Sequence, residues 1–137
     1  MIHYLLATPQ TCAWGYFDAS LPPCLEIESG ETVIVETVSG GPEHIPPEGK
    51  GFDVPAELFD IHRECSAMLP GHILTGPIAI KGATPGDVLQ VDILDISLRQ
   101  NWGWNIIRPL SGTLPDEFQS GRKVTIPLNL KTMMAEL

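Results

Sequence analysis

Proline and glycine interrupt this sequence at short intervals, with 13 of each among its 137 residues. Proline lacks the backbone donor that a helix interior needs, and glycine weakens helices, so long helices are disfavoured. Such spacing is typical of short strands joined by turns. The sequence therefore predicts a mainly β chain, barrel-like or sandwich-like, with residues 1–137 forming a single domain because nothing marks a linker.

Several stretches are rich in alternating apolar or β-branched residues and are expected to form strands: 24–28, 32–38, 73–80, 87–98 and 124–130. The first two flank a Ser-Gly turn, which predicts a hairpin. Gly76 and Pro77 interrupt the third stretch. The fourth, residues 87–98, is the longest signal. Its apolar positions change parity near Ile93, which predicts a bulge there.

One α-helix is expected, over about residues 55–69. Its apolar positions recur every three or four residues and form one stripe: Leu58, Ile61, His62, Cys65, Met68 and Leu69. Pro55 suits the first turn, and Pro70-Gly71 would end the helix. A lone histidine on such a stripe is more often packed than liganding, so we interpret His62 as a packed side chain.

The charge balance narrows the function classes. Lys plus Arg number 8 against 17 for Asp plus Glu, which gives a net charge of −9. Such an acidic surface repels phosphate backbones and anionic lipids, so neither nucleic-acid binding nor membrane binding is expected. The chain has no apolar run long enough to cross a bilayer, and its start lacks a signal-peptide pattern, so we expect a cytoplasmic protein.

Cysteines and histidines give no motif by themselves. The three cysteines have no Cys-x-x-Cys spacing, and the four histidines are scattered. His72 opens a strand-like run beside small residues, where an imidazole can approach a ligand or a metal. The alternative is a histidine that bonds a turn carbonyl, and the residues alone favour that alternative. Trp102 and Trp104 flank Gly103, which suits either a pocket wall or a turn capped by core aromatics.

The run from His72 to Ile96 resembles the signature of the acetamidase/formamidase family. There, a histidine-led Leu-Ser/Thr-Gly-Pro-Ile segment precedes Gly-Ala-x-Pro-Gly-Asp and an alternating strand. Shorter stretches also fit the family: residues 3–5, 14–23, 36–42 and 102–115. The resemblance covers about residues 3–118 in order and implies the N-terminal part of a longer family fold, with the second half absent. The chain is therefore expected to be a fragment, a truncated product or one piece of a split enzyme.

The resemblance implies a β-rich amidase that hydrolyses short linear amides, such as formamide and acetamide, to carboxylate and ammonia. It also implies a divalent metal, with zinc as the expected ion, which would activate water and polarise the amide carbonyl. The residues carried over are His72 as metal ligand or acid/base and Glu36 as a catalytic carboxylate. Thr75, Trp102 and Trp104 are carried over as the substrate pocket.

The expected partners are a small amide substrate and either further copies of the chain, in a homo-oligomer, or a complementing second-half chain. A function of a different class stays open beside the amidase. In that alternative, the chain is a truncated, non-catalytic β scaffold that binds a partner chain or a small ligand. Ammonia release with bound metal would favour the enzyme, whereas oligomerisation without metal would favour the scaffold.

Overall fold

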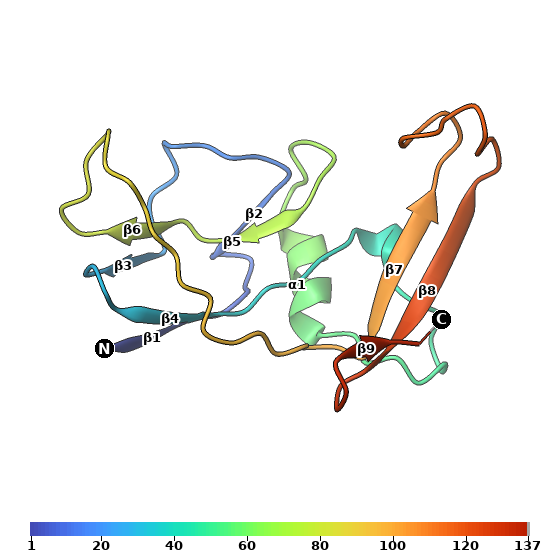
Figure 1. Cartoon of the computed structure of the whole chain (residues 1–137), viewed down its shortest axis with the longest axis horizontal. Coiled ribbons are helices and arrows are strands. Elements are labelled where there is room, and N and C mark those ends of the chain that lie inside the picture. The colour runs from blue at the N-terminus through green and yellow to red at the C-terminus, as the bar shows by residue number, and fades with distance from the viewer. Residues whose placement is uncertain (137) are drawn as a thin grey trace. The chain divides into compact units, whose positions relative to one another are not determined.

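The structure, a computed structural model, describes residues 1–136 and is mainly β, as predicted (Figure 1). Within these residues it has one α-helix, α1 (Ala56–Glu64), and one short 3-10 helix, η1 (Pro42–His44). The chain divides into two compact units. Unit 1 comprises Met1–Glu43 and Pro55–Leu94, and unit 2 comprises His44–Val54 and Asp95–Leu137. That residues 1–137 behave as a single domain stays a prediction.

Unit 1 contains three separate two-stranded sheets. The pairs are parallel β1 (Ile2–Leu5) with β4 (Thr32–Val35), antiparallel β2 (Cys12–Trp14) with β5 (Ile73–Thr75), and parallel β3 (Leu25–Ile27) with β6 (Ile78–Ile80). Each pair joins segments that are far apart in the sequence, as the colours in Figure 1 show. The strands formed by residues 1–136 do not close into a barrel.

The predicted hairpin between residues 24–28 and 32–38 is wrong. A turn does form there, because the Glu31 N–H donates to the Glu28 carbonyl at 3.2 Å. The strands on either side of it nevertheless take other partners, since β3 pairs with β6 and β4 pairs with β1. Backbone bonds continue both pairings, for example from Lys81 N–H to the Ile27 carbonyl at 2.8 Å. Local alternation predicted the strands but not their partners.

The predicted interruption of residues 73–80 is confirmed. Strand β5 ends at Thr75 and β6 begins at Ile78, and the two strands belong to different sheets. The Gly76 N–H donates to the Thr11 carbonyl at 2.8 Å, and the Pro77 carbonyl accepts from Cys24 N–H at 2.8 Å. Because of this break, residues 73–80 contribute one strand to each of two sheets.

The predicted strand over residues 87–98 is not formed, so the bulge expected at Ile93 has no strand to interrupt. A strand exists only where another strand supplies backbone hydrogen bonds. Every strand formed by residues 1–136 pairs elsewhere, and residues 88–97 stay exposed. Residues 87–98 have the alternation of a strand, but no other strand within residues 1–136 pairs with them.

Helix α1 is shorter than predicted. Leu58 and Ile61 are fully buried on its apolar stripe, as expected. The helix ends at Glu64, because the Cys65 backbone turns to an extended conformation. Beyond it, the Met68 N–H donates to the Trp14 carbonyl at 3.2 Å, so this stretch bonds to the end of β2 instead of continuing the helix. None of the helices within residues 1–136 has the length and apolarity to span a membrane.

The core of unit 1 is small and mostly aliphatic. Its buried apolar residues come from β1, β2, β5, α1 and the adjoining loops: Leu5, Ala7, Ala13, Val38, Leu58, Ile61 and Ile73. His62 is packed, as interpreted from the sequence. Its ring stacks on Trp14 with centroids 5.3 Å apart, and its Nε2 lies 2.8 Å from the Gly40 carbonyl.

Unit 2 is a three-stranded antiparallel sheet in the order β7 (Trp102–Ile107), β8 (Arg122–Asn129) and β9 (Met134–Ala135). Strand β8 confirms the strand predicted near residues 124–130. Trp102 is 1% exposed, and its Nε1–H donates to the Asp53 carbonyl at 2.9 Å. His44 stacks on Trp104 with centroids 3.7 Å apart. Segment His44–Val54 is therefore held against β7 by one aromatic stack and a part-buried hydrogen bond.

Candidate functional site

Unit 1 has an open pocket of about 600 Å³, which we call the unit 1 pocket. Its walls come from β2 and the segment after it, from β5, and from the Gly76-Pro77 break. Ala13, Leu21 and Ile73 contribute apolar surface. Polar groups also line it, namely Tyr16, Asp18, Thr37 and Thr75. This size and mixture suit a small organic ligand with an apolar part and a polar head.

The antiparallel pairing of β2 with β5 builds this pocket. Ala13 lies opposite Leu74 in the register, and the pairing continues where Gly15 N–H donates to the His72 carbonyl at 3.0 Å. A left-handed backbone at Gly15, with φ of +88°, turns the chain away from the strand, which suits glycine. The aromatic segment that follows therefore lies beside the residues of β5.

Thr75 and Glu36, two of the predicted site residues, are in contact. The Thr75 Oγ1–H donates to the backbone carbonyl of Glu36 at 2.8 Å, and Cys12 Sγ lies 3.7 Å from Thr75 Oγ1. The structure thus brings Thr75 and the backbone of Glu36 together. Thr75 lines the unit 1 pocket, and its role in binding substrate stays a prediction. Glu36 is half-buried, and the next residue, Thr37, also lines the pocket.

Asp18 supplies a negative charge at the unit 1 pocket. Its Oδ1 accepts hydrogen bonds from the Ser20 hydroxyl at 2.7 Å and from the Ser20 N–H at 2.8 Å. Both bonds lower the pKa of the Asp18 carboxyl, the hydroxyl contributing most, so Asp18 is a carboxylate at neutral pH. The hydroxyls of Tyr16 and Thr37 make no hydrogen bond with other groups of residues 1–136. The pocket therefore offers one ionised acceptor and two available hydroxyl donors.

His72 is exposed immediately before β5, three residues before Thr75. Its carbonyl belongs to the β2–β5 pairing, and its side chain makes no hydrogen bond or ion pair within residues 1–136. In this part of the chain, no three His, Cys, Asp or Glu side chains lie close enough together to hold a metal ion. The described residues do not fit a metal centre by themselves, so His72 as a ligand stays a prediction.

Trp102 and Trp104 belong to unit 2, where Trp102 is buried and Trp104 stacks on His44. Their proposed place in a substrate pocket also stays a prediction. Neither tryptophan lines the pocket of about 350 Å³ that unit 2 contains at the end of β7.

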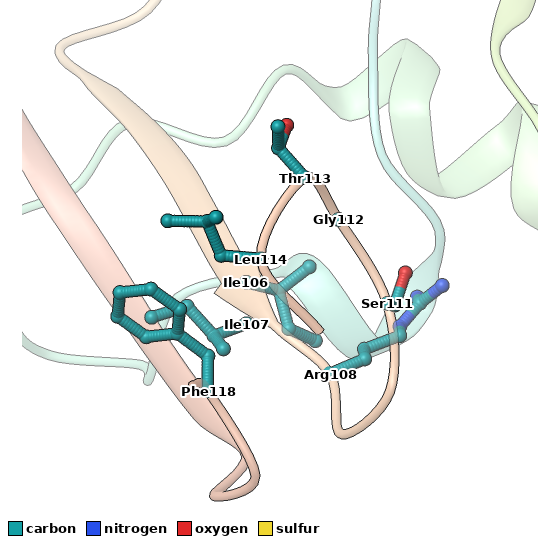
Figure 2. A pocket seen from close by; sticks show the side chains of 8 residues that line it. All are labelled: Ile106, Ile107, Arg108, Ser111, Gly112, Thr113, Leu114 and Phe118. Carbon is teal, nitrogen blue, oxygen red and sulfur yellow. The ribbon is translucent and has the colours of Figure 1, made fainter. Parts of the chain in front are cut away.

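The unit 2 pocket lies in the connection between β7 and β8 (Figure 2). Figure 2 shows the apolar side chains of Ile106, Leu114 and Phe118 in it, with Arg108 and Ser111 on the other side of the loop. It contains none of the residues predicted for catalysis and no carboxylate. The larger unit 1 pocket is therefore the candidate functional site.

The cysteines supply no further chemistry. All three are free thiols, in agreement with the absence of a disulfide pattern in the sequence. Burial raises the pKa of the Cys12 and Cys65 thiols, which keeps them protonated at neutral pH. Protonated thiols are poor nucleophiles, so these two cysteines are packed side chains.

Sequence reasoning missed Tyr16, Asp18 and Thr37 as site residues. A signal for the first two existed, because Trp14-Gly-Tyr-Phe-Asp18 combines aromatic residues with a glycine that allows a turn. Thr37 has no such signal, since it follows a β-branched run like any other strand residue. Its place at the pocket depends on the distant β5 strand.

The fold defines the chain as a β-rich protein, with the unit 1 pocket as its candidate site. The model of the Acetamidase/Formamidase family matches residues 8–134. The chain belongs to this family.

Three curated relatives agree with the family match. A candidate formamidase of Schizosaccharomyces pombe is 34% identical over 84 residues, which are 61% of this chain and 18% of that protein. An acetamidase of Mycolicibacterium smegmatis is 62% identical over 29 residues, 21% of this chain and 7% of that protein. A formamidase of Methylophilus methylotrophus is 50% identical over 36 residues, 25% of this chain and 9% of that protein.

The matched part of this chain thus spans less than a fifth of the length of each of these relatives. No solved structure matches the chain.

Proposed function

We propose that this chain contributes the amide-binding pocket of an enzyme that hydrolyses linear amides to carboxylate and ammonia. The observation that carries the proposal is the unit 1 pocket, which combines the Asp18 carboxylate, available hydroxyls and an apolar wall next to Thr75. Family membership and relatives named formamidase and acetamidase support the reaction class.

A primary amide needs both kinds of polar partner that the unit 1 pocket offers. Its NH₂ group would donate to the Asp18 carboxylate, and its carbonyl would accept from the hydroxyl of Tyr16 or Thr37. Its acyl group would lie against Ala13 and Ile73. A pocket of about 600 Å³ exceeds what formamide fills, so acyl chains longer than formyl would also be accommodated.

The proton transfers are assigned to the predicted catalytic residues. His72 would act as general base on the attacking water and then return the proton to the leaving ammonia. Glu36 would supply the carboxylate that stabilises the imidazolium form of that base. Both roles rest on the family resemblance, and neither His72 nor Glu36 lines the unit 1 pocket.

The proposal also includes a divalent metal ion in the whole enzyme, with zinc as the first candidate. Because residues 1–136 bring no three ligands together, any metal held by His72 would need ligands from other polypeptide. Metal chemistry therefore depends on the whole enzyme. A cytoplasmic location likewise stays part of the proposal.

The test separates binding from turnover. Binding of acetamide and butyramide to the purified chain would be followed by NMR shifts of the unit 1 amides, and ammonia release would be measured on the same samples. Replacing the Asp18 carboxylate in Asp18→Asn should weaken binding about tenfold, because a charge-assisted hydrogen bond is lost at an exposed site. Asp116→Asn, in an exposed loop of unit 2, is the matched control and should bind normally.

Turnover that is lost in both Asp18→Asn and His72→Ala would support catalysis by this chain. Binding without turnover would support the pocket and assign the chemistry to additional polypeptide. If neither amide shifts any unit 1 resonance, the unit 1 pocket is not the amide site and the proposal fails.

A further inference from the structure

Charge is distributed very unevenly between the two units. Unit 1 carries two Lys or Arg side chains against eleven Asp or Glu, whereas unit 2 carries six of each kind. Both bases of unit 1, Arg63 and Lys81, already form ion pairs with carboxylates. The whole net charge of −9 therefore belongs to unit 1. A negatively charged small molecule is repelled by unit 1, whereas unit 2 has no net charge to oppose it.

Arg108 is the base of unit 2 that lines a cavity, the unit 2 pocket of about 350 Å³. Its guanidinium makes no hydrogen bond or ion pair within residues 1–136, and no Asp or Glu lines the pocket. The positive charge is therefore not neutralised where it meets the pocket. A guanidinium presents a planar fork of N–H donors that matches the two oxygens of a carboxylate.

A tight turn holds a hydroxyl close to this guanidinium. The Ser111 N–H donates to the Arg108 carbonyl at 3.2 Å, so these two residues are the two ends of one turn. Figure 2 draws their side chains next to each other. Leu110, inside the turn, has φ of +57°, a strained conformation for a residue with a Cβ. Strained residues of this kind cluster at ligand sites, which supports a functional reason for the turn.

The hydroxyls of the unit 2 pocket are available to a ligand. Ser111 and Thr113 both line it, and neither hydroxyl makes a hydrogen bond within residues 1–136. Each can therefore donate to an anionic oxygen bound at the guanidinium.

The rest of the unit 2 pocket is apolar. Ile106, Leu114 and Phe118 line it, and Figure 2 shows them on the other side of the loop from Arg108 and Ser111. Leu114 is 49% exposed and Phe118 is 48% exposed, so each keeps apolar surface that a ligand can cover. A volume of about 350 Å³ is at the small end of the range for ligand pockets. A matching ligand therefore has an anionic head and a short apolar tail.

We propose that the unit 2 pocket binds short-chain monocarboxylates, with the carboxylate on Arg108 and Ser111 and the alkyl tail against Leu114 and Phe118. Inorganic phosphate satisfies the same donors but leaves the apolar side unfilled. An uncharged amide fills the apolar side but leaves the guanidinium without an anion. Short-chain carboxylates are also the products of amide hydrolysis, so the site would respond to product; this link alone rests on the proposed function.

The test is a titration of the full chain with butyrate, followed by the amide resonances of residues 106–118, with NaCl used to keep the ionic strength constant. Butyrate should shift these resonances saturably. Formate, which has no tail, should bind about tenfold more weakly, because each buried methylene is worth up to about fourfold in affinity. Inorganic phosphate should also bind more weakly than butyrate, and butyramide should shift none of these resonances.

Substitutions separate the head from the tail. Arg108→Gln should weaken butyrate binding at least about tenfold, and Arg108→Lys should be intermediate, because it keeps the charge without the fork. Arg122→Gln is the matched control, since Arg122 is an exposed base of β8 that does not line the pocket, and it should bind butyrate normally. Leu114→Ala should weaken the binding of butyrate but not that of formate. The dispersed amide resonances of β7 and β8 check that each variant stays folded.

The proposal is overturned if butyrate causes no saturable shift in residues 106–118. It is equally overturned if Arg122→Gln weakens binding as much as Arg108→Gln does, or if phosphate or butyramide binds as tightly as butyrate. Its failure is distinguishable from that of the proposed function, because the amide site is read from unit 1 resonances and this site from unit 2 resonances.

Discussion

The two units of this chain are both β-rich, but they are assembled in opposite ways. Unit 1 consists of three two-stranded sheets, two of them parallel, and each joins segments from distant parts of the sequence. Unit 2 is one antiparallel sheet whose strands follow each other along the chain. The comparison shows that a chain can combine a locally encoded sheet with one that depends on distant partners.

Their cores differ as well. Unit 1 distributes burial over seven small or aliphatic side chains, whereas Trp102 is the one large apolar side chain of unit 2 that is buried within the described residues. A core that depends on one aromatic ring should be more vulnerable to a single substitution than a distributed core.

The largest effect is expected from Trp102→Ala. Removing a fully buried indole costs about 3–5 kcal/mol, and the hydrogen bond to the Asp53 carbonyl is lost as well. We expect unit 2 to unfold, as measured by loss of the dispersed amide resonances of β7 and β8. Trp102→Phe keeps a ring but no N–H, and should be intermediate.

The matched substitution in unit 1 is Leu58→Ala, since Leu58 is also fully buried. If the distributed core compensates, the β1 and β4 resonances should persist in this variant. Loss of both units' resonances in both variants would show that the units fold together and would contradict the comparison.

A smaller effect is expected from Gly15→Ala, which probes the turn between β2 and the unit 1 pocket. Gly15 has φ of +88°, and an added Cβ would collide with the Leu69 carbonyl. The free energy of unfolding should fall by about 1–3 kcal/mol, as measured by urea titration. Gly30→Ala is the control, because Gly30 has φ of +84° but open space around it, so only the strain of the backbone remains. Equal losses in both variants would show that the contact with Leu69 is unimportant.

The smallest effect concerns Glu31, which follows the turn before β4. Hydrogen bonding to the Glu28 N–H, and then to His3, lowers the pKa of the Glu31 carboxyl from 4.5 to about 2. Because the folded pKa is the lower one, the stabilisation is present above about pH 4.5 and is lost as the pH falls toward 2.

Glu31→Gln removes this pH-dependent part. The melting temperatures of the wild type and the variant should therefore differ most at neutral pH and converge near pH 2. A difference that stays constant over that range would show that the carboxylate contributes nothing specific to unit 1.

Much of the fold could be predicted from local patterns, and the family could be recognised from the run that begins at His72. Helix α1, the break at Gly76-Pro77 and the strand near residues 124–130 all follow from residue type and spacing. Pairing in unit 1 could not be predicted, because β-branched residues such as those of β4 suit any neighbour. The false hairpin between β3 and β4 and the unformed strand at 87–98 have this same cause.

The candidate site was predictable only in part. Thr75 could be named from its place in the family signature, and it does line the unit 1 pocket. Asp18 reaches that pocket through the pairing of β2 with β5, which brings residues near position 15 to residues near position 75. Thr37 reaches it next to Glu36, whose carbonyl accepts a hydrogen bond from Thr75. No local sequence pattern predicts that these residues lie close together.

The long separations in unit 1 also have a consequence in time. Cys12 and Thr75 are 63 residues apart, so a ribosome that adds about 5–20 residues per second makes β2 roughly 3–13 s before β5. During that interval β2 and β3 have no partner, and their apolar side chains are available to chaperones or to other nascent chains. The brevity of these strands, three residues each, limits what they can wrongly pair with while they wait.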